Sequence, residues 1–153
     1  LGSDERYLHR GLPYGVAFTG LWSLFVPLIA PGVVDALEPE MERLKALCFR
    51  LDVATVHAYA PMGPRSFYAR DFAPLLGIPE DPVTGSANAA LGALLARAGV
   101  VPRREGKVLL TVYQGHHLGN PGVVEVQVEY SPTGEPYSVQ IGGEAVIVQT
   151  GEV

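Results

Sequence analysis

The residues best suited to chemistry stand together in one loop, Asp81-Pro82-Val83-Thr84-Gly85-Ser86, immediately before an apolar helical segment. Backbone N–H groups in the first turn of a helix lack intrahelical partners and carry a partial positive charge, so they attract carboxylates. Gly85 would let a ligand approach this backbone closely, and the Ser86 hydroxyl can cap the helix or donate to the ligand. Asp81 adds a carboxyl group that can exchange a proton with a bound molecule. The same residues also fit an ordinary capped helix, with Thr84 or Ser86 as the cap and Asp81 as a solvated turn residue.

The segment behind this loop, Ala87–Ala98, consists of Ala, Leu and Gly apart from Asn88 and Arg97. A helix that is apolar on all sides must be surrounded by protein or lipid, and this one is too short to cross a membrane. Gly99 is typical of a residue that ends a helix. The sequence therefore predicts one central, buried helix over about residues 86–98.

A second, short helix is predicted over about residues 39–48. Pro39 is typical of a helix start, acidic side chains follow in the first turn, and Met41, Leu44 and Leu47 share one face. This pattern indicates an amphipathic helix on the surface of the domain.

Most of the remaining chain reads as strands, because polar and apolar residues alternate or β-branched and aromatic residues are enriched. The predicted strand segments are Tyr14–Ile29 with a bend at Gly20, Leu51–Ala60, Ser66–Arg70, Gly106–Tyr113, Val123–Tyr130 and Tyr137–Val148. Ser131–Gly134 predicts a hairpin turn between the last two. Strands and helices do not alternate regularly, which favours an α+β fold over a doubly wound sheet.

Length and composition limit the number of domains. With 153 residues, 48% of them hydrophobic, the chain can bury one core. We expect a single domain over residues 11–153 behind a flexible segment over residues 1–10. The chain can equally be one half of a larger pseudo-symmetric protein.

Several stretches carry a resemblance to a known family. They are Arg70–Pro74 with Gly77–Asn88, then Gln114-Gly115 with Leu118-Gly119, the end segment Gly142–Val146, and the run from Phe18 to Leu28. Together they resemble the C-terminal half of PhzF-like proteins, the phenazine-biosynthesis branch of the diaminopimelate-epimerase-like fold. The resemblance extends from Tyr14 to the end of the chain.

This resemblance implies a curled, mostly antiparallel sheet or barrel around the central helix, with the substrate bound between two similar halves. It also implies a proton-transfer isomerisation of a small amino or carboxylic acid without metal or organic cofactor, as a biosynthetic enzyme would perform it. By position, we expect Asp81 and Ser86 to be catalytic, and Thr84, Gly85, Ser86 and Ala87 to bind substrate. The family's principal base is a glutamate of the first half, with a histidine near it, and nothing in this chain matches that half.

Two hypotheses about function follow. In the first, the chain supplies the second half of the site of an isomerase, and its partner is the missing N-terminal half. In the second, it is a non-catalytic remnant or small-acid-binding domain that pairs with itself as a homodimer, because a second copy would imitate the family's two-half arrangement.

Other kinds of site have weaker support in the sequence. Cys48 is the single cysteine, so an intrachain disulfide, a cysteine metal cluster and a two-thiol racemase are not expected, and Cys48 itself should be a core residue. His116 and His117 would point to opposite faces of an extended segment, so we expect no metal site there. The sequence has neither the second glycine of a serine-hydrolase elbow nor a phosphate or dinucleotide fingerprint.

Charge and hydropathy exclude further classes of partner. The formal net charge is −5 and the sequence pI is about 5.3, whereas a nucleic-acid-binding domain usually shows a basic face. The longest apolar run, Val16–Ala30, is interrupted by polar residues and proline and falls short of a membrane span. We therefore expect no nucleic-acid partner, no membrane contact and a cytoplasmic location.

Overall fold

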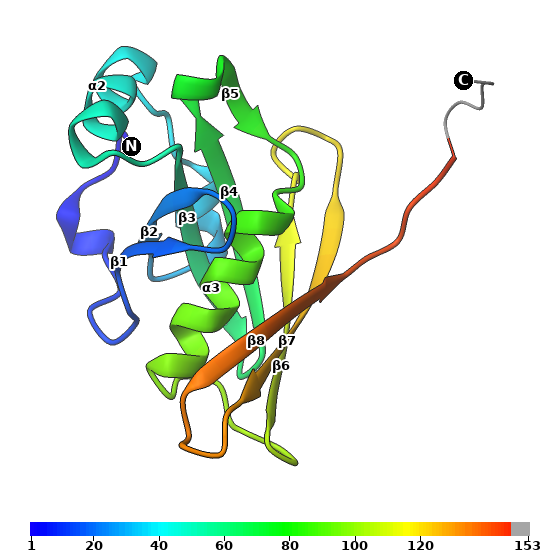
Figure 1. The fold of residues 1–153 in the computed structure, drawn as a ribbon. Coiled ribbons are helices and arrows are strands. Elements are labelled where there is room, and N and C mark those ends of the chain that lie inside the picture. Colours follow the sequence, from blue (N-terminus) through cyan, green and yellow to red (C-terminus); the bar gives the residue numbers. More distant parts are fainter. Residues whose placement is uncertain (148–153) are drawn as a thin grey trace.

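One curled sheet of eight strands forms most of the fold, as a computed structural model shows for residues 1–147 (Figure 1). The strands are β1 (Gly15–Phe18), β2 (Trp22–Pro27), β3 (Thr55–Gly63), β4 (Ser66–Ala73), β5 (Ile78–Asp81), β6 (Lys107–Gln114), β7 (Gly122–Tyr130) and β8 (Pro136–Gly142). Their order is β1-β2-β3-β4-β6-β7-β8, and β5 pairs with β4. Neighbours are antiparallel except in the pairs β2–β3 and β4–β6.

The sheet does not close into a barrel within the described residues. No pairing there joins β1 to β8, so the sheet curls as a half-barrel with two free edges. The α+β class and the curled, mostly antiparallel sheet agree with the expectation from sequence, whereas a complete barrel does not. A closed barrel needs its first and last strands to pair.

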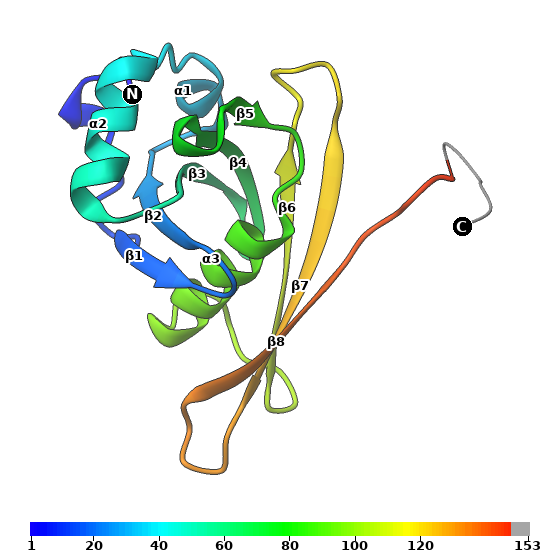
Figure 2. The ribbon, with the colours of Figure 1, turned by 45° about the horizontal axis from the view of Figure 1, so that its top comes forward.

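Both parallel strand pairs arise where the chain crosses over through helices, as parallel neighbours require. Between β2 and β3 the chain forms α1 (Pro31–Asp35) and α2 (Met41–Leu51), and between β4 and β6 it forms α3 (Gly85–Arg97). α3 lies on the concave side of the sheet, while α1 and α2 cover the other face (Figure 2). Two short 3-10 helices, η1 (Glu5–Tyr7) and η2 (Pro74–Leu76), complete the elements of residues 1–147.

Each face of the sheet has its own core, because successive side chains of a strand point to opposite faces. On the α3 side, Tyr59 of β3 and Phe67 of β4 pack with Leu91 and Leu95 of the helix. The core on the other side contains Val34, Leu37, Leu44, Cys48, Val56, Ala58 and Phe72. Most residues of α3 are buried, so this apolar segment has protein around most of its surface.

Several boundaries differ from the expectation. α2 continues to Leu51 and the next strand begins at Thr55, whereas the sequence suggested a helix end near residue 48 and a strand from Leu51. The residue that follows the helix, Asp52, takes a left-handed conformation with φ of 53°. Such a conformation is usual for glycine and less common for Asp, so the composition did not indicate the end of this helix.

Other differences concern short elements. The sequence analysis assigned no element to Pro31–Asp35 or to Ile78–Asp81, but the first forms α1 and the second forms the short strand β5. β8 ends at Gly142, so it is shorter than the predicted segment, whose last residue, Val148, lies outside the described residues. Residues 1–10, expected to be flexible, include η1. None of the helices in residues 1–147 is long and apolar enough to span a membrane.

Candidate functional site

The predicted site loop lies where two strands share one edge of β4. The first half of β4 pairs with β6, in a register that ends at Ala69 opposite Gln114. The second half pairs with β5, and there Asp71 stands opposite Asp81. The chain then leaves β5 and turns directly into α3, so the end of β6, the end of β5 and the start of the helix meet at this point (Figure 1).

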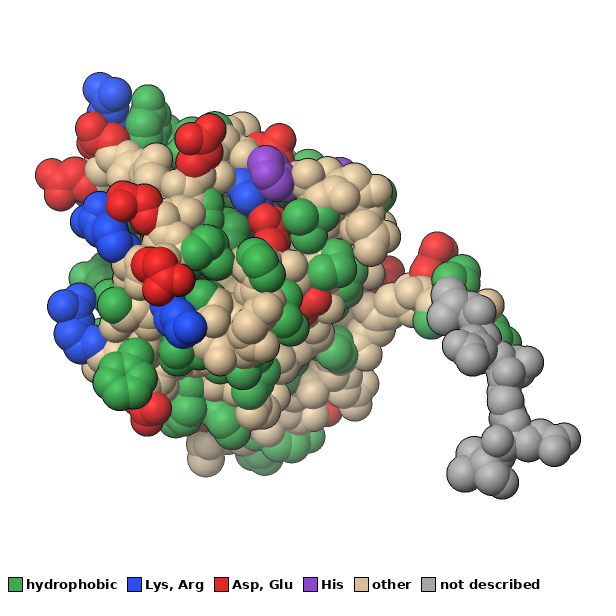
Figure 3. Space-filling view, turned by 90° about the horizontal axis from the view of Figure 1, so that it is seen from above, with side chains coloured by type: hydrophobic (Ala, Val, Ile, Leu, Met, Phe, Trp, Pro, Cys, Tyr) green, Lys and Arg blue, Asp and Glu red, His purple; other side chains and the backbone are tan. Residues whose placement is uncertain are grey.

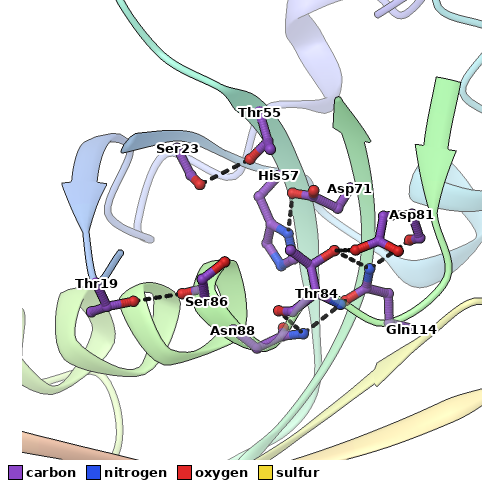
Figure 4. Close-up of polar contacts among 10 residues, drawn as sticks. All are labelled: Thr19, Ser23, Thr55, His57, Asp71, Asp81, Thr84, Ser86, Asn88 and Gln114. Atoms are coloured by element: carbon purple, nitrogen blue, oxygen red, sulfur yellow. Dashed lines mark hydrogen bonds and ion pairs between the residues drawn. The ribbon is translucent and has the colours of Figure 1, made fainter. Parts of the chain in front are cut away.

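Gln114 of β6 joins these three ends by hydrogen bonds, and it is completely buried. Its Nε2 donates to the carbonyl oxygen of Asp81 at 2.8 Å and to Oγ1 of Thr84 at 3.0 Å. Its Oε1 accepts from the Thr84 N–H at 3.2 Å and from Nδ2 of Asn88 at 2.7 Å (Figure 4). One amide side chain therefore determines the path of the loop between the strand and the helix.

The Asp81 carboxyl group is held from within the loop itself. The Thr84 hydroxyl donates to Oδ2 of Asp81 at 2.7 Å, and the Asp81 side chain remains half-buried. Thr84 precedes the first residue of α3, but its side chain caps none of the helix amides. The amides of Gly85, Ser86 and Ala87 thus form the first turn of a buried helix without a side-chain cap, and helix geometry gives them no intrahelical acceptor.

Two other elements flank this first turn. The Thr19 hydroxyl, in the turn between β1 and β2, donates to the carbonyl oxygen of Ser86 at 2.6 Å. Gly20 follows with φ of 122°, a conformation that favours glycine, and a Cβ there would lie 4.0 Å from Cβ of Ser86. On the opposite side, a Cβ at Gly85 would come within 2.7 Å of Cδ1 of Ile141 in β8. Gly85 therefore permits the close approach between helix and strand.

The structure brings all five predicted site residues together, but they differ in exposure. Asp81, Gly85 and Ser86 are partly exposed, whereas Thr84 and Ala87 are buried. The side chain of Ala87 is 1% exposed, so only its backbone N–H is suited to meet a ligand. The assignment of these residues to catalysis and substrate binding stays a prediction.

Glu80, the residue before Asp81 in β5, anchors the strand to the rest of the domain. Glu80 forms an almost completely buried ion pair with Arg70 of β4, in which Nε donates to Oε1 at 2.9 Å and Nη2 donates to Oε2 at 2.8 Å. The remaining nitrogen of Arg70 donates to the carbonyl oxygens of Val34, Asp35 and Leu37. This bidentate arrangement fixes β5 against β4 and the α1 region.

Polar residues that sequence reasoning did not assign to the site also converge here. Gln114 appeared only as part of a family-like Gln-Gly segment, while Asn88, Thr19 and a buried pair formed by His57 and Asp71 received no role. Apart from Thr19, which lies in a turn, their common signal is a polar residue inside an otherwise apolar strand or helix. That signal shows that a partner exists, but the partner itself depends on the fold.

Cys48 is completely buried in the core between α2 and the sheet, as expected. Burial raises the pKa of its thiol, and the negative charge of Asp71 adds to that rise. A thiol in this environment is a poor nucleophile at neutral pH. Within residues 1–147, no three His, Cys, Asp or Glu side chains come together in a way that could hold a metal ion.

Comparison with known proteins places this chain in a family. A family model described as "Phenazine biosynthesis-like protein" matches residues 1–151. An uncharacterized isomerase of Deinococcus radiodurans is 52% identical over 151 residues, covering 99% of this chain and 49% of the relative. The uncharacterized isomerase YddE of Escherichia coli is 35% identical over 142 residues, covering 90% of this chain and 46% of the relative. The chain belongs to the phenazine biosynthesis-like family, and it spans about half the length of these curated relatives.

Solved structures show the same fold. A PhzF-family protein of Bacillus anthracis superposes with a TM-score of 0.75 at 24% identity, covering 95% of this chain and 52% of that structure. A hydroxyproline epimerase of Agrobacterium vitis, solved with trans-4-hydroxy-L-proline, superposes with a TM-score of 0.56 at 13% identity, covering 84% of this chain and 40% of that structure. At these identities the likeness concerns the fold alone.

Proposed function

We propose that this chain supplies the second half of the active site of a PhzF-like isomerase that acts on a small amino or carboxylic acid by proton transfer. The observation that carries the proposal is the position of Asp81, whose half-buried carboxyl group stands beside the uncapped first turn of α3. The family of the chain and the word isomerase in the names of its relatives support this reaction class.

In this proposal the substrate's carboxylate binds to the amides of Gly85, Ser86 and Ala87. Three adjacent N–H groups at a helix N-terminus, together with the helix dipole, suit one carboxylate. The Ser86 hydroxyl is the adjacent donor. Asp81 holds or relays a proton at the substrate carbon, since its carboxyl group is already oriented by Thr84.

The strong base of the reaction comes from outside this chain. Family resemblance assigns that role to a glutamate of the first half, and the chain spans about half of its relatives. The proposed reaction moves a proton within one substrate molecule, so it is balanced without an oxidant, a reductant or a cofactor.

The test uses the chain joined to a first half in a complete two-half protein. Asp81→Asn should lower the rate of solvent deuterium incorporation into the substrate by about 10²-fold or more, the usual contribution of a general acid or base. Ser86→Ala should weaken binding of the carboxylate. Asp52→Asn and Ser138→Ala make the same chemical changes away from the site and should leave both quantities unaltered. Unchanged turnover and binding in both site variants would refute the proposal.

The second candidate, a self-associating binding domain, is favoured by exposed apolar side chains on the two free edges. Tyr14, just before β1, is 82% exposed, and the ring centroids of Phe18 in β1 and Trp22 in β2 lie 5.1 Å apart at the surface. On β8, Tyr137 and Ile141 are exposed. Charged side chains gather instead toward α2, at the end of the molecule shown in Figure 3.

Such an apolar surface suits a partner of similar shape, which is either the first half or a second copy of this chain. Sedimentation of the chain alone separates these arrangements. A dimer at micromolar concentration supports self-association, and Trp22→Lys, with Phe49→Lys on α2 as a control, should dissociate it. A well-behaved monomer would count against the homodimer.

A further inference from the structure

The face of the sheet beneath α3 changes character along the strands. Under the middle and last turns of the helix it is apolar and carries Tyr59, Phe67 and Ala69. Under the first turn it is polar and completely enclosed. The side chains there are Ser23, Thr55, His57, Asp71 and Gln114, none more than 1% exposed.

Within this polar layer, His57 of β3 and Asp71 of β4 form a buried pair. Nδ1 of His57 lies 2.9 Å from Oδ1 of Asp71, and both side chains are 0% exposed. The two residues are direct cross-strand partners, and Asp71 is in turn the partner of Asp81 on β5. Partners across antiparallel strands point to the same face, so His57, Asp71 and Asp81 form one row across three strands (Figure 4).

The pair leaves two of its own polar atoms without a protein partner within residues 1–147. Among the described residues, Nε2 of His57 and Oδ2 of Asp71 have no hydrogen-bond partner, and neither does Oδ1 of Asn88. Burying unpaired polar atoms destabilises a fold, and well-packed apolar residues in the place of a buried ionisable pair are often neutral or stabilising. A buried polar pair of this kind can instead fix the position of two strands relative to each other.

The geometry around Asp81 indicates what that role is. β5 has four residues, and its register with β4 shifts between Asp71 and Ala73. Two interactions thus hold the backbone of Asp81. One is its strand pairing with Asp71, and the other is the hydrogen bond from the Gln114 side chain to its carbonyl oxygen. A shift of Asp71 would move Asp81 and loosen the hydrogen bonds that orient its carboxyl group.

We propose that His57 and Asp71 are positioning residues, and that their buried hydrogen bond holds β4 where it pairs with Asp81 and so maintains the bonds joining Asp81, Thr84 and Gln114. The proposal rests on the proposed function only for the catalytic use of Asp81. His57 acts as the donor through Nδ1, because a carboxylate can only accept hydrogen bonds.

The test is an NMR comparison of two substitutions in the 153-residue chain. His57→Asn keeps an N–H donor near the position of Nδ1, whereas His57→Leu replaces the ring with an apolar side chain. The signals to follow are the side-chain amide of Gln114 and the exchange rate of the Thr84 N–H, which bonds to Gln114. Exchange at Leu91, in the core of α3, reports whether the fold is intact.

We expect His57→Leu to shift the Gln114 amide signals and to speed Thr84 exchange about tenfold, which corresponds to loss of one net hydrogen bond. His57→Asn should restore both. His116→Leu, at an exposed histidine, should change neither.

Wild-type signals in His57→Leu would overturn the proposal, as would equal shifts in both variants, which indicate a packing role. If His57→Leu does not fold, His57→Asn decides: wild-type signals support the proposal and altered signals overturn it. No measurement here needs a substrate. If the two-half protein were inactive but the His57 variants gave the expected NMR results, the proposed function would be refuted and this inference would stand.

Discussion

Gln114→Leu should destabilise the domain strongly, because it removes four hydrogen bonds at one position, three of them buried and one partly buried. Leucine is close in size to glutamine, so the packing around it changes little. Each bond contributes about 1 kcal/mol net, which predicts a loss of about 4 kcal/mol. The Thr84 N–H remains buried without this partner, so the loss should not fall below that value.

For a chain of this length, a loss of that size lowers the midpoint of thermal unfolding by about 12 °C, at about 3 °C per kcal/mol. Circular dichroism and urea unfolding measure the two quantities independently. Gln127→Leu on β7 is the matched control, because its side chain is half-exposed and its bonds are long, at 3.3 and 3.5 Å. We expect that control to change the free energy of unfolding by no more than about 0.5 kcal/mol.

The reasoning would be refuted by a loss below about 1 kcal/mol in Gln114→Leu, the value of a single ordinary hydrogen bond. It would also be refuted if both glutamine variants were equally destabilised. Either result would mean that the connection between β5 and α3 keeps its path without the amide.

Three further predictions concern other buried groups. Arg70→Met leaves the Glu80 carboxylate buried without its ion pair and should lower the free energy of unfolding by about 3–5 kcal/mol in urea titration. Cys48, whose thiol pKa is raised by burial, should react with a disulfide reagent at pH 8 at least about tenfold more slowly than in the unfolded chain. Burial and the hydrogen bond to Asp35 raise the pKa of Tyr68 from 10.0 to about 12, so stability should fall as pH rises from 10 toward 12, and Tyr68→Phe should flatten that decline.

Each of these three has a result that would contradict it. Arg43→Met breaks an exposed ion pair and should lower the free energy of unfolding by less than about 1 kcal/mol. If Arg70→Met lowered it by the same amount, burial of the Arg70–Glu80 pair would add nothing to its effect on stability. Reaction of Cys48 at the rate of the unfolded chain would show that the core between α2 and the sheet opens readily. An alkaline decline that persists in Tyr68→Phe and disappears in Tyr137→Phe would assign it to the exposed phenol.

Local sequence was sufficient for features that depend on neighbouring residues. The loop from Asp81 to Ser86 and the helix behind it are contiguous, and the apolar composition of that helix indicates burial whatever surrounds it. The alternating patterns located most strands, since alternation reflects the two faces of any sheet. β5 was missed because its four residues follow Gly77 and include Pro79, which read as a turn.

The tertiary structure decided which distant polar side chains meet that loop. Gln114 is 33 residues from Asp81 in sequence, and it reaches the loop because β5 and β6 share one edge of β4. His57 and Asp71 meet because β3 and β4 pair in one particular register, and a shift of one residue would send either side chain to the opposite face. Sequence alone thus determined where a helix N-terminus and a carboxyl group lie side by side. Strand order and register, which depend on long-range packing, determined what holds them in place.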